Sequence, residues 1–182
     1  MKKTSLFCAV AAGLLAIAPV AYAADGTIDF TGQITGLTCT INGGGGNNNF
    51  TVTLPPVSTS SLAAVGSVAG RTPFSITLTG CTPDTGTVAV EFLAGPSVDV
   101  GTGQLITDPG VGMAGNVQIR LLNSDFTQIM IGAALGTQNS HAVSIDSGSA
   151  TLNYYIEYAQ HGALGATPGV ASSRVQYTLI YQ

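Results

Sequence analysis

Two histidines are the residues of this 182-residue chain best suited to acid–base or metal chemistry. His141 and His161 lie in stretches rich in Gly, Ser and Asn, and neither belongs to an H-E-x-x-H pattern that would hold zinc. A serine nucleophile would call for a G-x-S-x-G elbow, which the sequence lacks, and Ser149 belongs to an ordinary Asp-Ser-Gly-Ser turn. We therefore predict that the chain is not an enzyme. A small secreted hydrolase that depends on a histidine is the alternative.

The acidic residues are scattered along the sequence. Asp84, Asp99 and Asp108 could each contribute to a calcium site, but the dense D-x-D-x-D spacing of calcium loops is missing. No close pair of carboxylates could divide the roles of acid and base. We expect no metal and no cofactor.

The charge balance excludes one class of partner. Five Lys and Arg face nine Asp and Glu, the formal net charge is −4, and two of the cations are Lys2 and Lys3. Proteins that bind nucleic acid neutralise phosphates with clustered cations, and no such cluster exists here. We expect no nucleic-acid partner.

The N-terminus has the pattern of a secretory signal peptide, which we assign to residues 1–23. Lys2 and Lys3 precede the apolar stretch 6–18, and Ala21-Tyr22-Ala23 forms a small-x-small cleavage site. The apolar stretch is too short to span a bilayer. The chain is therefore expected to be exported.

Cleavage of this leader removes Cys8 and leaves Cys39 and Cys81. An even pair of cysteines in an exported chain most simply forms one disulfide, worth roughly 4 kcal/mol for a loop of this size. A metal or redox pair is the alternative, but the two cysteines lack close spacing and a neighbouring histidine.

Short runs in which apolar and polar residues alternate predict β-strands along the rest of the chain. These runs are residues 27–34, 50–54, 74–78, 88–92, 117–121, 152–158 and 175–181. Only residues 60–65 could form a helical turn, and the Gly/Asn-rich segment 43–49 is expected to be a mobile loop. Many short strands separated by turns indicate an all-β antiparallel sandwich of immunoglobulin-like type.

Both ends of the mature chain are unusual for a closed sandwich. The N-terminal run puts four residues on one face: Ile28, Phe30, Gly32 and Ile34. This face must be buried, either in the protein's own sheet or in another chain. The C-terminal run also has an apolar face, formed by Val175, Tyr177, Leu179 and Tyr181, and the chain ends directly after it. The missing neighbour at this end favours donation of the N-terminal run to another chain.

These features together resemble the pilin subunits of chaperone–usher fimbriae, the family of type 1 and P pili. The resemblance rests on the alternating N-terminal arm with its Gly32, on Cys39 just after the arm and on Cys81 at the end of a strand. It also includes Gly169 and the penultimate Tyr181. The early start of the arm and the Gly/Asn insert differ from the family pattern.

The resemblance implies an incomplete immunoglobulin-like sandwich that lacks its last strand. It implies that Ile28, Phe30, Gly32 and Ile34 form a donor strand for the next subunit. The rim of the accepting groove, which a chaperone also contacts, is expected at Gly169, Val175, Tyr177, Leu179 and Tyr181. The implied partners are neighbouring pilin subunits, a periplasmic chaperone, an outer-membrane usher and a host receptor.

The expected organisation is a signal peptide (1–23), a donor-strand extension (24–36) and a pilin domain (37–182). The expected function is a structural subunit of a surface fimbria that polymerises by donor-strand exchange and supports adhesion. The alternative is a tip or adaptor subunit that binds a host glycan directly.

Overall fold

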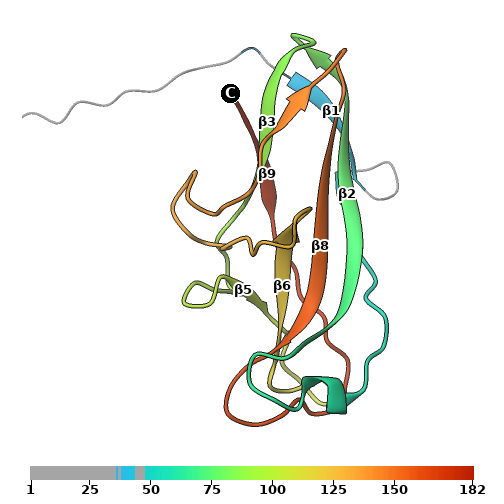
Figure 1. Cartoon of the computed structure of the whole chain (residues 1–182), viewed down its shortest axis with the longest axis vertical. Coiled ribbons are helices and arrows are strands. Elements are labelled where there is room, and N and C mark those ends of the chain that lie inside the picture. Colours follow the sequence, from blue (N-terminus) through green and yellow to red (C-terminus); the bar gives the residue numbers. More distant parts are fainter. Residues whose placement is uncertain (1–35, 37, 44–47) are drawn as a thin grey trace, which may run out of the picture. The chain divides into compact units, whose positions relative to one another are not determined.

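A computed structural model describes residue 36, residues 38–43 and residues 48–182 of the chain. The described residues belong to one compact unit, Thr35–Gln182. Their strands form two sheets around one cluster of buried apolar side chains (Figure 1). The expected leader, 1–23, and the expected donor residues Ile28, Phe30, Gly32 and Ile34 lie outside the described residues.

The larger sheet has six strands in the order β1-β2-β8-β6-β5-β4, and every neighbouring pair is antiparallel. Its strands are β1 (Thr38–Gly43), β2 (Val68–Thr82), β8 (Ala150–Gln160), β6 (Val117–Asn123), β5 (Gln104–Ile106) and β4 (Val98–Asp99). The long β2 and β8 form its centre and pair from Val68↔Ala159 to Leu78↔Ala150.

The smaller sheet has three antiparallel strands in the order β7-β3-β9, with bounds Val143–Ile145, Gly86–Phe92 and Tyr177–Tyr181. The short β7 covers only the first three residues of β3. Farther along, the buried side-chain amide of Gln138 accepts from the Phe92 N–H at 3.0 Å and donates to the Phe92 carbonyl at 2.6 Å. This amide thus replaces a strand partner on that edge of β3.

The core follows from the alternation seen in the sequence, because successive side chains of a strand point to opposite faces. Val88 and Val90 of β3 are fully buried, and so is Leu78 of β2. Leu152 and Tyr154 of β8 add to the same cluster.

The all-β sandwich is confirmed, and so is the disulfide. Cys39 in β1 and Cys81 in β2 are bonded with an S–S distance of 2.08 Å. A 3-10 helix, η1 (Thr59–Leu62), overlaps the expected helical turn. No helix of the described ranges is long and apolar enough to cross a membrane.

The prediction of a β-strand at residues 50–54 is wrong in one respect. The side chains alternate between half-buried and exposed, as in a strand, but the segment pairs with no strand among the described residues. Strand assignment depends on ladder hydrogen bonds to a partner, and the sequence pattern reports only the alternation.

Candidate functional site

Strand β9 forms one edge of the smaller sheet and has an open side. It pairs with β3 from Val88↔Tyr181 to Phe92↔Tyr177. Hydrogen bonds extend this pairing beyond both ends of β9, from the Leu93 N–H to the Gln176 carbonyl at 2.8 Å and between Thr87 and Gln182. On its other side, β9 has no strand partner in the part of the chain that the structure describes. An open edge carries unpaired N–H and C=O groups and can accept a further strand.

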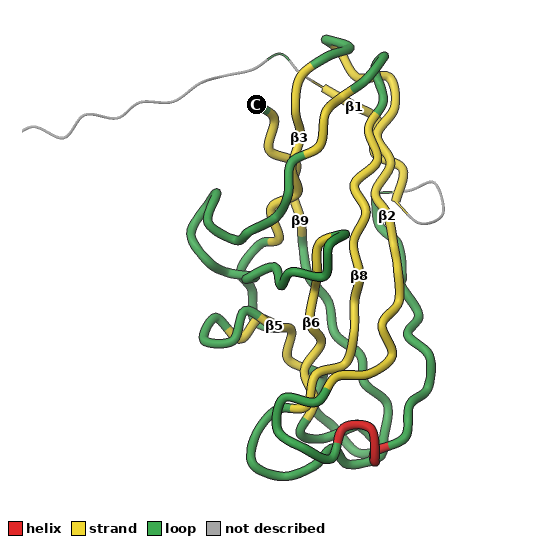
Figure 2. The backbone as a smooth tube through the Cα atoms, viewed as in Figure 1, coloured by secondary structure: helices red, strands yellow, loops and turns green. Residues whose placement is uncertain are grey.

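A groove of about 740 Å³ runs along this open edge. Residues 173–179 and Tyr181 line one wall of the groove, on the β9 side. Residues 48–52 line the second wall. Figure 2 shows the segment before β9 and the segment before η1 as long irregular stretches. The groove therefore lies between one edge strand and one extended segment that has no strand partner within residues 48–182.

The groove borders the protein's apolar core. Its lining includes core residues that are at most 3% exposed: Ile76, Phe92, Leu105 and Leu121. Half-buried apolar side chains of Ile41, Phe50, Phe74 and Ile156 complete it. An uncovered apolar strip beside unpaired backbone is a surface that needs a partner.

Aromatic rings line one part of the groove. The Tyr177 hydroxyl donates a hydrogen bond of 2.8 Å to the Asn48 carbonyl on the opposite side. The Phe50 ring meets the Tyr177 ring edge-on at 6.5 Å and lies 6.1 Å from Phe74. Burial raises the pKa of Tyr177, and also that of Tyr181, where a hydrogen bond with the Cys39 backbone acts in the opposite direction. Both hydroxyls are therefore neutral over the physiological pH range.

The structure brings four of the five expected rim residues together. Val175, Tyr177, Leu179 and Tyr181 are half-buried and line the groove. Their spacing by two puts them on one face of β9 and of the residues just before it.

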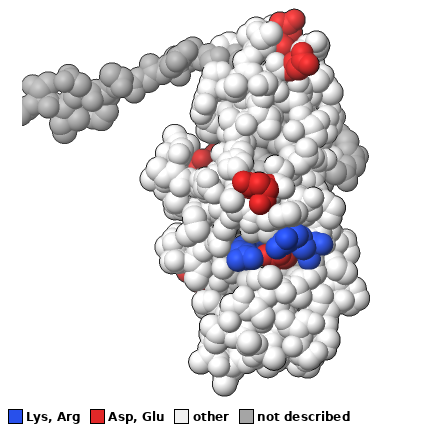
Figure 3. Space-filling model, viewed as in Figure 1, with Lys and Arg blue, Asp and Glu red and all other residues white. Residues whose placement is uncertain are grey.

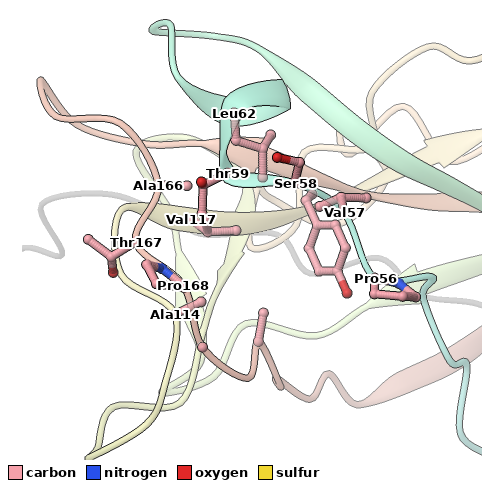
Figure 4. A pocket seen from close by; sticks show the side chains of 13 residues that line it. Pro56, Val57, Ser58, Thr59, Leu62, Ala114, Val117, Ala166, Thr167 and Pro168 are labelled. Carbon is pink, nitrogen blue, oxygen red and sulfur yellow. The ribbon is translucent and has the colours of Figure 1, made fainter.

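Gly169 lies elsewhere. It lines a smaller pocket of about 190 Å³, between residues 56–59 and 166–169 (Figure 4). A Cβ at Gly169 would lie 2.3 Å from the Met113 carbonyl carbon. Close packing of two loops therefore requires a glycine at position 169. The family resemblance alone could not indicate this role.

The second wall of the groove, Asn48–Val52, was not expected as a site. The alternation in 50–54 is its signal in the sequence, but alternation alone predicts a strand and not a groove wall. The floor residues were also missed, because a core residue has the same sequence pattern whether or not it borders a groove.

The residues first considered for chemistry are dispersed. His141 and His161 are exposed, and Ser149 lies in the turn closed by the Asp146–Ser149 bridge. Within residues 36, 38–43 and 48–182, no group of three His, Cys, Asp or Glu side chains could hold a metal ion.

Comparisons with known proteins identify the family. A family model described as "Type-1 fimbrial protein, A" (FimA) matches residues 54–182. The major fimbrial subunit SMF-1 of Stenotrophomonas maltophilia is 48% identical over 92% of this chain and 99% of its own. The F17 fimbrial protein of Escherichia coli is 37% identical over the full length of both chains.

A solved structure shares the fold. A chain in the structure of a chaperone–usher pilus aligns with a TM-score of 0.59 at 21% identity, covering 91% of this chain and 100% of that one. The family match and the two relatives show a non-enzymatic structural protein of cell-surface fimbriae. The chain belongs to the FimA-type family of pilin subunits, which polymerise into the rods of chaperone–usher pili.

Proposed function

We propose that this pilin is a major shaft subunit and that its groove accepts the N-terminal arm of the next subunit. The observation that carries the proposal is the open edge of β9 beside an apolar groove. The 48% identity with a major fimbrial subunit over nearly the whole chain supports a shaft position over a tip position.

The arm has the pattern that such a groove would accept. Ile28, Phe30 and Ile34 alternate with polar residues, so an extended arm presents them on one side. Burying these three side chains contributes roughly 5–9 kcal/mol. Backbone hydrogen bonds to β9 add on the order of 1 kcal/mol each. At Gly32 the absence of a side chain lets two backbones approach closely.

Such binding is β-strand addition, and it is head-to-tail. A subunit's arm and its groove are different surfaces, so each addition leaves one new groove or arm unused. Heterologous contacts of this kind generate open filaments.

The exposed apolar strip also explains the need for helper proteins. Before assembly, an uncovered edge strand and groove would aggregate. A periplasmic chaperone would cover them with a strand of its own, and an outer-membrane usher would be the place where the arm of the next subunit replaces that strand. Through the fimbria the subunit would support adhesion, including contact with a host receptor.

Two complementary variants test the proposal. The first lacks residues 24–34 and retains the groove. The second retains the arm and carries Leu179→Arg, which puts a charge into the apolar groove. Each variant alone should give no ladder of SDS-resistant oligomers that collapse on boiling. A mixture of the two should stop at the dimer, because one supplies the only groove and the other the only arm. Long ladders from the arm-deleted variant would contradict donor-strand exchange.

A further inference from the structure

Three charged residues form a cluster on the outer face of the larger sheet (Figure 3). Glu157 of β8 points away from the core residues Leu152 and Tyr154 on the same strand, because side chains alternate. Arg71 Nε of β2 donates to Glu157 Oε2 at 2.8 Å. Arg120 Nε of β6 donates to Glu157 Oε1 at 2.9 Å, and Arg120 Nη2 contacts the same oxygen.

The cluster has one positive charge in excess. The Glu157 side chain is only 1% exposed, whereas those of Arg71 and Arg120 are 39% and 25% exposed. Arg71 uses only its Nε on Glu157, and its terminal nitrogens have no acceptor among the described residues. An arginine fixed through Nε can still offer its terminal N–H groups to a carboxylate.

Aromatic packing holds this arginine in place. The Arg71 guanidinium lies 4.5 Å from the centre of the Phe126 ring, and that ring lies 4.8 Å from the Tyr155 ring. Phe126 is 49% exposed and has a φ of 69° in its turn, a conformation that is uncommon for a residue with a large side chain. A cation stacked on a ring loses less freedom when it binds an anion.

The chain itself supplies the complementary charge. Its formal net charge is −4. The β2–β3 and β7–β8 turns, which carry Asp84 and Asp146, lie at the same end of the unit (Figure 1) and are joined by the Gly148 N–H to Asp84 carbonyl hydrogen bond of 3.0 Å. Both aspartates are exposed, and neither forms a salt bridge within residues 48–182.

We propose that Arg71 and Arg120 form a docking site for the Asp84 and Asp146 end of a second copy of this chain, and that this contact joins non-consecutive subunits within a fimbria. The inference rests on the proposed function, because polymerisation is what brings many copies together. One exposed ion pair is weak, but repetition along a fibre makes such a contact effective.

The test uses fibres purified from cells that express the full chain. Arg71→Gln removes the stacked charge and leaves Arg120 on Glu157. Asp84→Asn with Asp146→Asn removes the complementary charges. Fibre diameter is measured by electron microscopy between about 0.01 M and about 1 M salt, where the Debye length falls from about 30 Å to about 3 Å. In wild-type fibres the contact between non-consecutive subunits should break as the salt concentration rises, and the fibre diameter should change at that point, which we call opening. Each variant should open at a salt concentration lower by about twofold or more.

The combined variant decides whether the two sets of residues are partners. Removal of both should lower the opening concentration no further than the aspartate variant does alone, whereas the effects of independent sites would add. Asp108→Asn is the control, because the Asp108 carboxylate lies 3.4 Å from Arg174 of its own chain and is not part of either proposed surface. It should behave as wild type.

Three outcomes would overturn the inference: a diameter that does not depend on salt, additive effects, or a normal opening concentration for the aspartate variant. Opening of wild-type fibres by sialyllactose, with the aspartate variant unchanged, would also overturn it and would assign the arginines to an acidic sugar. The ladder of SDS-resistant oligomers reports separately on donor-strand exchange. If wild-type chains form no ladder, the proposed function fails. If the ladder persists with unchanged salt dependence, only this inference fails.

Discussion

The Tyr177 hydroxyl reaches across the groove to the backbone carbonyl of Asn48, at 2.8 Å. The two residues belong to the two segments that an added strand would have to separate or bridge. Asn48 precedes the extended segment that has no strand partner among the described residues, so its carbonyl is a natural acceptor for the N–H of an incoming strand. Under the proposed donor-strand exchange, Tyr177 would therefore compete with that strand for one hydrogen bond.

Tyr177→Phe should speed the filling of the groove. The change removes the hydroxyl and keeps the ring packed against Phe50. One hydrogen bond has a net worth of about 0.5–1.5 kcal/mol, so the rate should rise by at most about tenfold. Fluorescence anisotropy with a labelled peptide of residues 24–36 measures the rate. Tyr155→Phe on the outer face is the control, and equal rates for wild type and Tyr177→Phe would show that the bond does not limit entry.

Gly169→Ala should prevent stable folding. The new Cβ would lie 2.3 Å from the Met113 carbonyl carbon and 2.4 Å from the Ala114 nitrogen, both of which are backbone atoms. Relief of this clash requires movement of two packed loops, and we expect a loss of more than about 4 kcal/mol. Gly95→Ala is the matched control, because nothing lies within 4 Å of its Cβ position. Urea unfolding of the two variants compares them, and similar midpoints would contradict the packing at Gly169.

Glu157→Gln should destabilise the subunit strongly. It leaves Arg71 and Arg120 side by side without the buried carboxylate that both contact. The two arginines that lose their acceptor are 39% and 25% exposed, so the cost should be that of lost hydrogen bonds to a charged group, about 1.5–3 kcal/mol. Asp108→Asn removes the partner of Arg174, whose side chain is 79% exposed, and should cost at most about 1 kcal/mol. Thermal unfolding should separate the two variants clearly, and equal melting temperatures would argue against a structural role for Glu157.

Tyr154 should make the subunit lose stability at alkaline pH. Burial raises the pKa of Tyr154 from 10.0 to about 12. Ser140 and the Val90 backbone act in the opposite direction, yet the buried Tyr154 hydroxyl makes no hydrogen bond of normal geometry within the described residues.

Between about pH 10 and about pH 12 the folded state keeps the proton of the Tyr154 hydroxyl, whereas the unfolded state releases it. The stability that this group contributes is therefore complete below about pH 10 and is lost as the pH rises toward about 12. The loss should reach about 3 kcal/mol. Urea unfolding at several pH values measures it. Tyr154→Phe should flatten the slope at little cost, since the hydroxyl has no partner to lose. An equal slope in the variant would assign the alkaline loss to other groups.

Local alternation was enough to predict the sandwich, because burial of one face imposes a period of two on each strand. Val88, Val90 and Leu152 all follow this rule. The disulfide was also predictable, since removal of the expected leader would leave Cys39 and Cys81 as the one pair. The shared face of Val175, Tyr177, Leu179 and Tyr181 was predictable from their spacing by two.

Other features depend on packing between distant segments, and local patterns do not report it. The alternation in 50–54 could not reveal that this segment pairs with no strand in the described part of the chain. The role of Gly169 depends on Met113, and that of Gln138 depends on Phe92. Arg71 and Arg120 meet Glu157 only because β2, β8 and β6 are neighbours in the larger sheet.

The placement of the arginines also decides where trypsin-like proteases can cut. The lysines are Lys2 and Lys3, and the other basic residues are Arg71, Arg120 and Arg174. Arg71 and Arg120 lie within paired strands and are held by Glu157, whereas Arg174 is exposed in an irregular segment. Cleavage after Arg174 would detach residues 175–182, which include all of β9. A single nick would therefore remove one whole side of the groove, so digestion of the bare subunit and of the assembled fibre gives a direct measure of how well β9 is shielded.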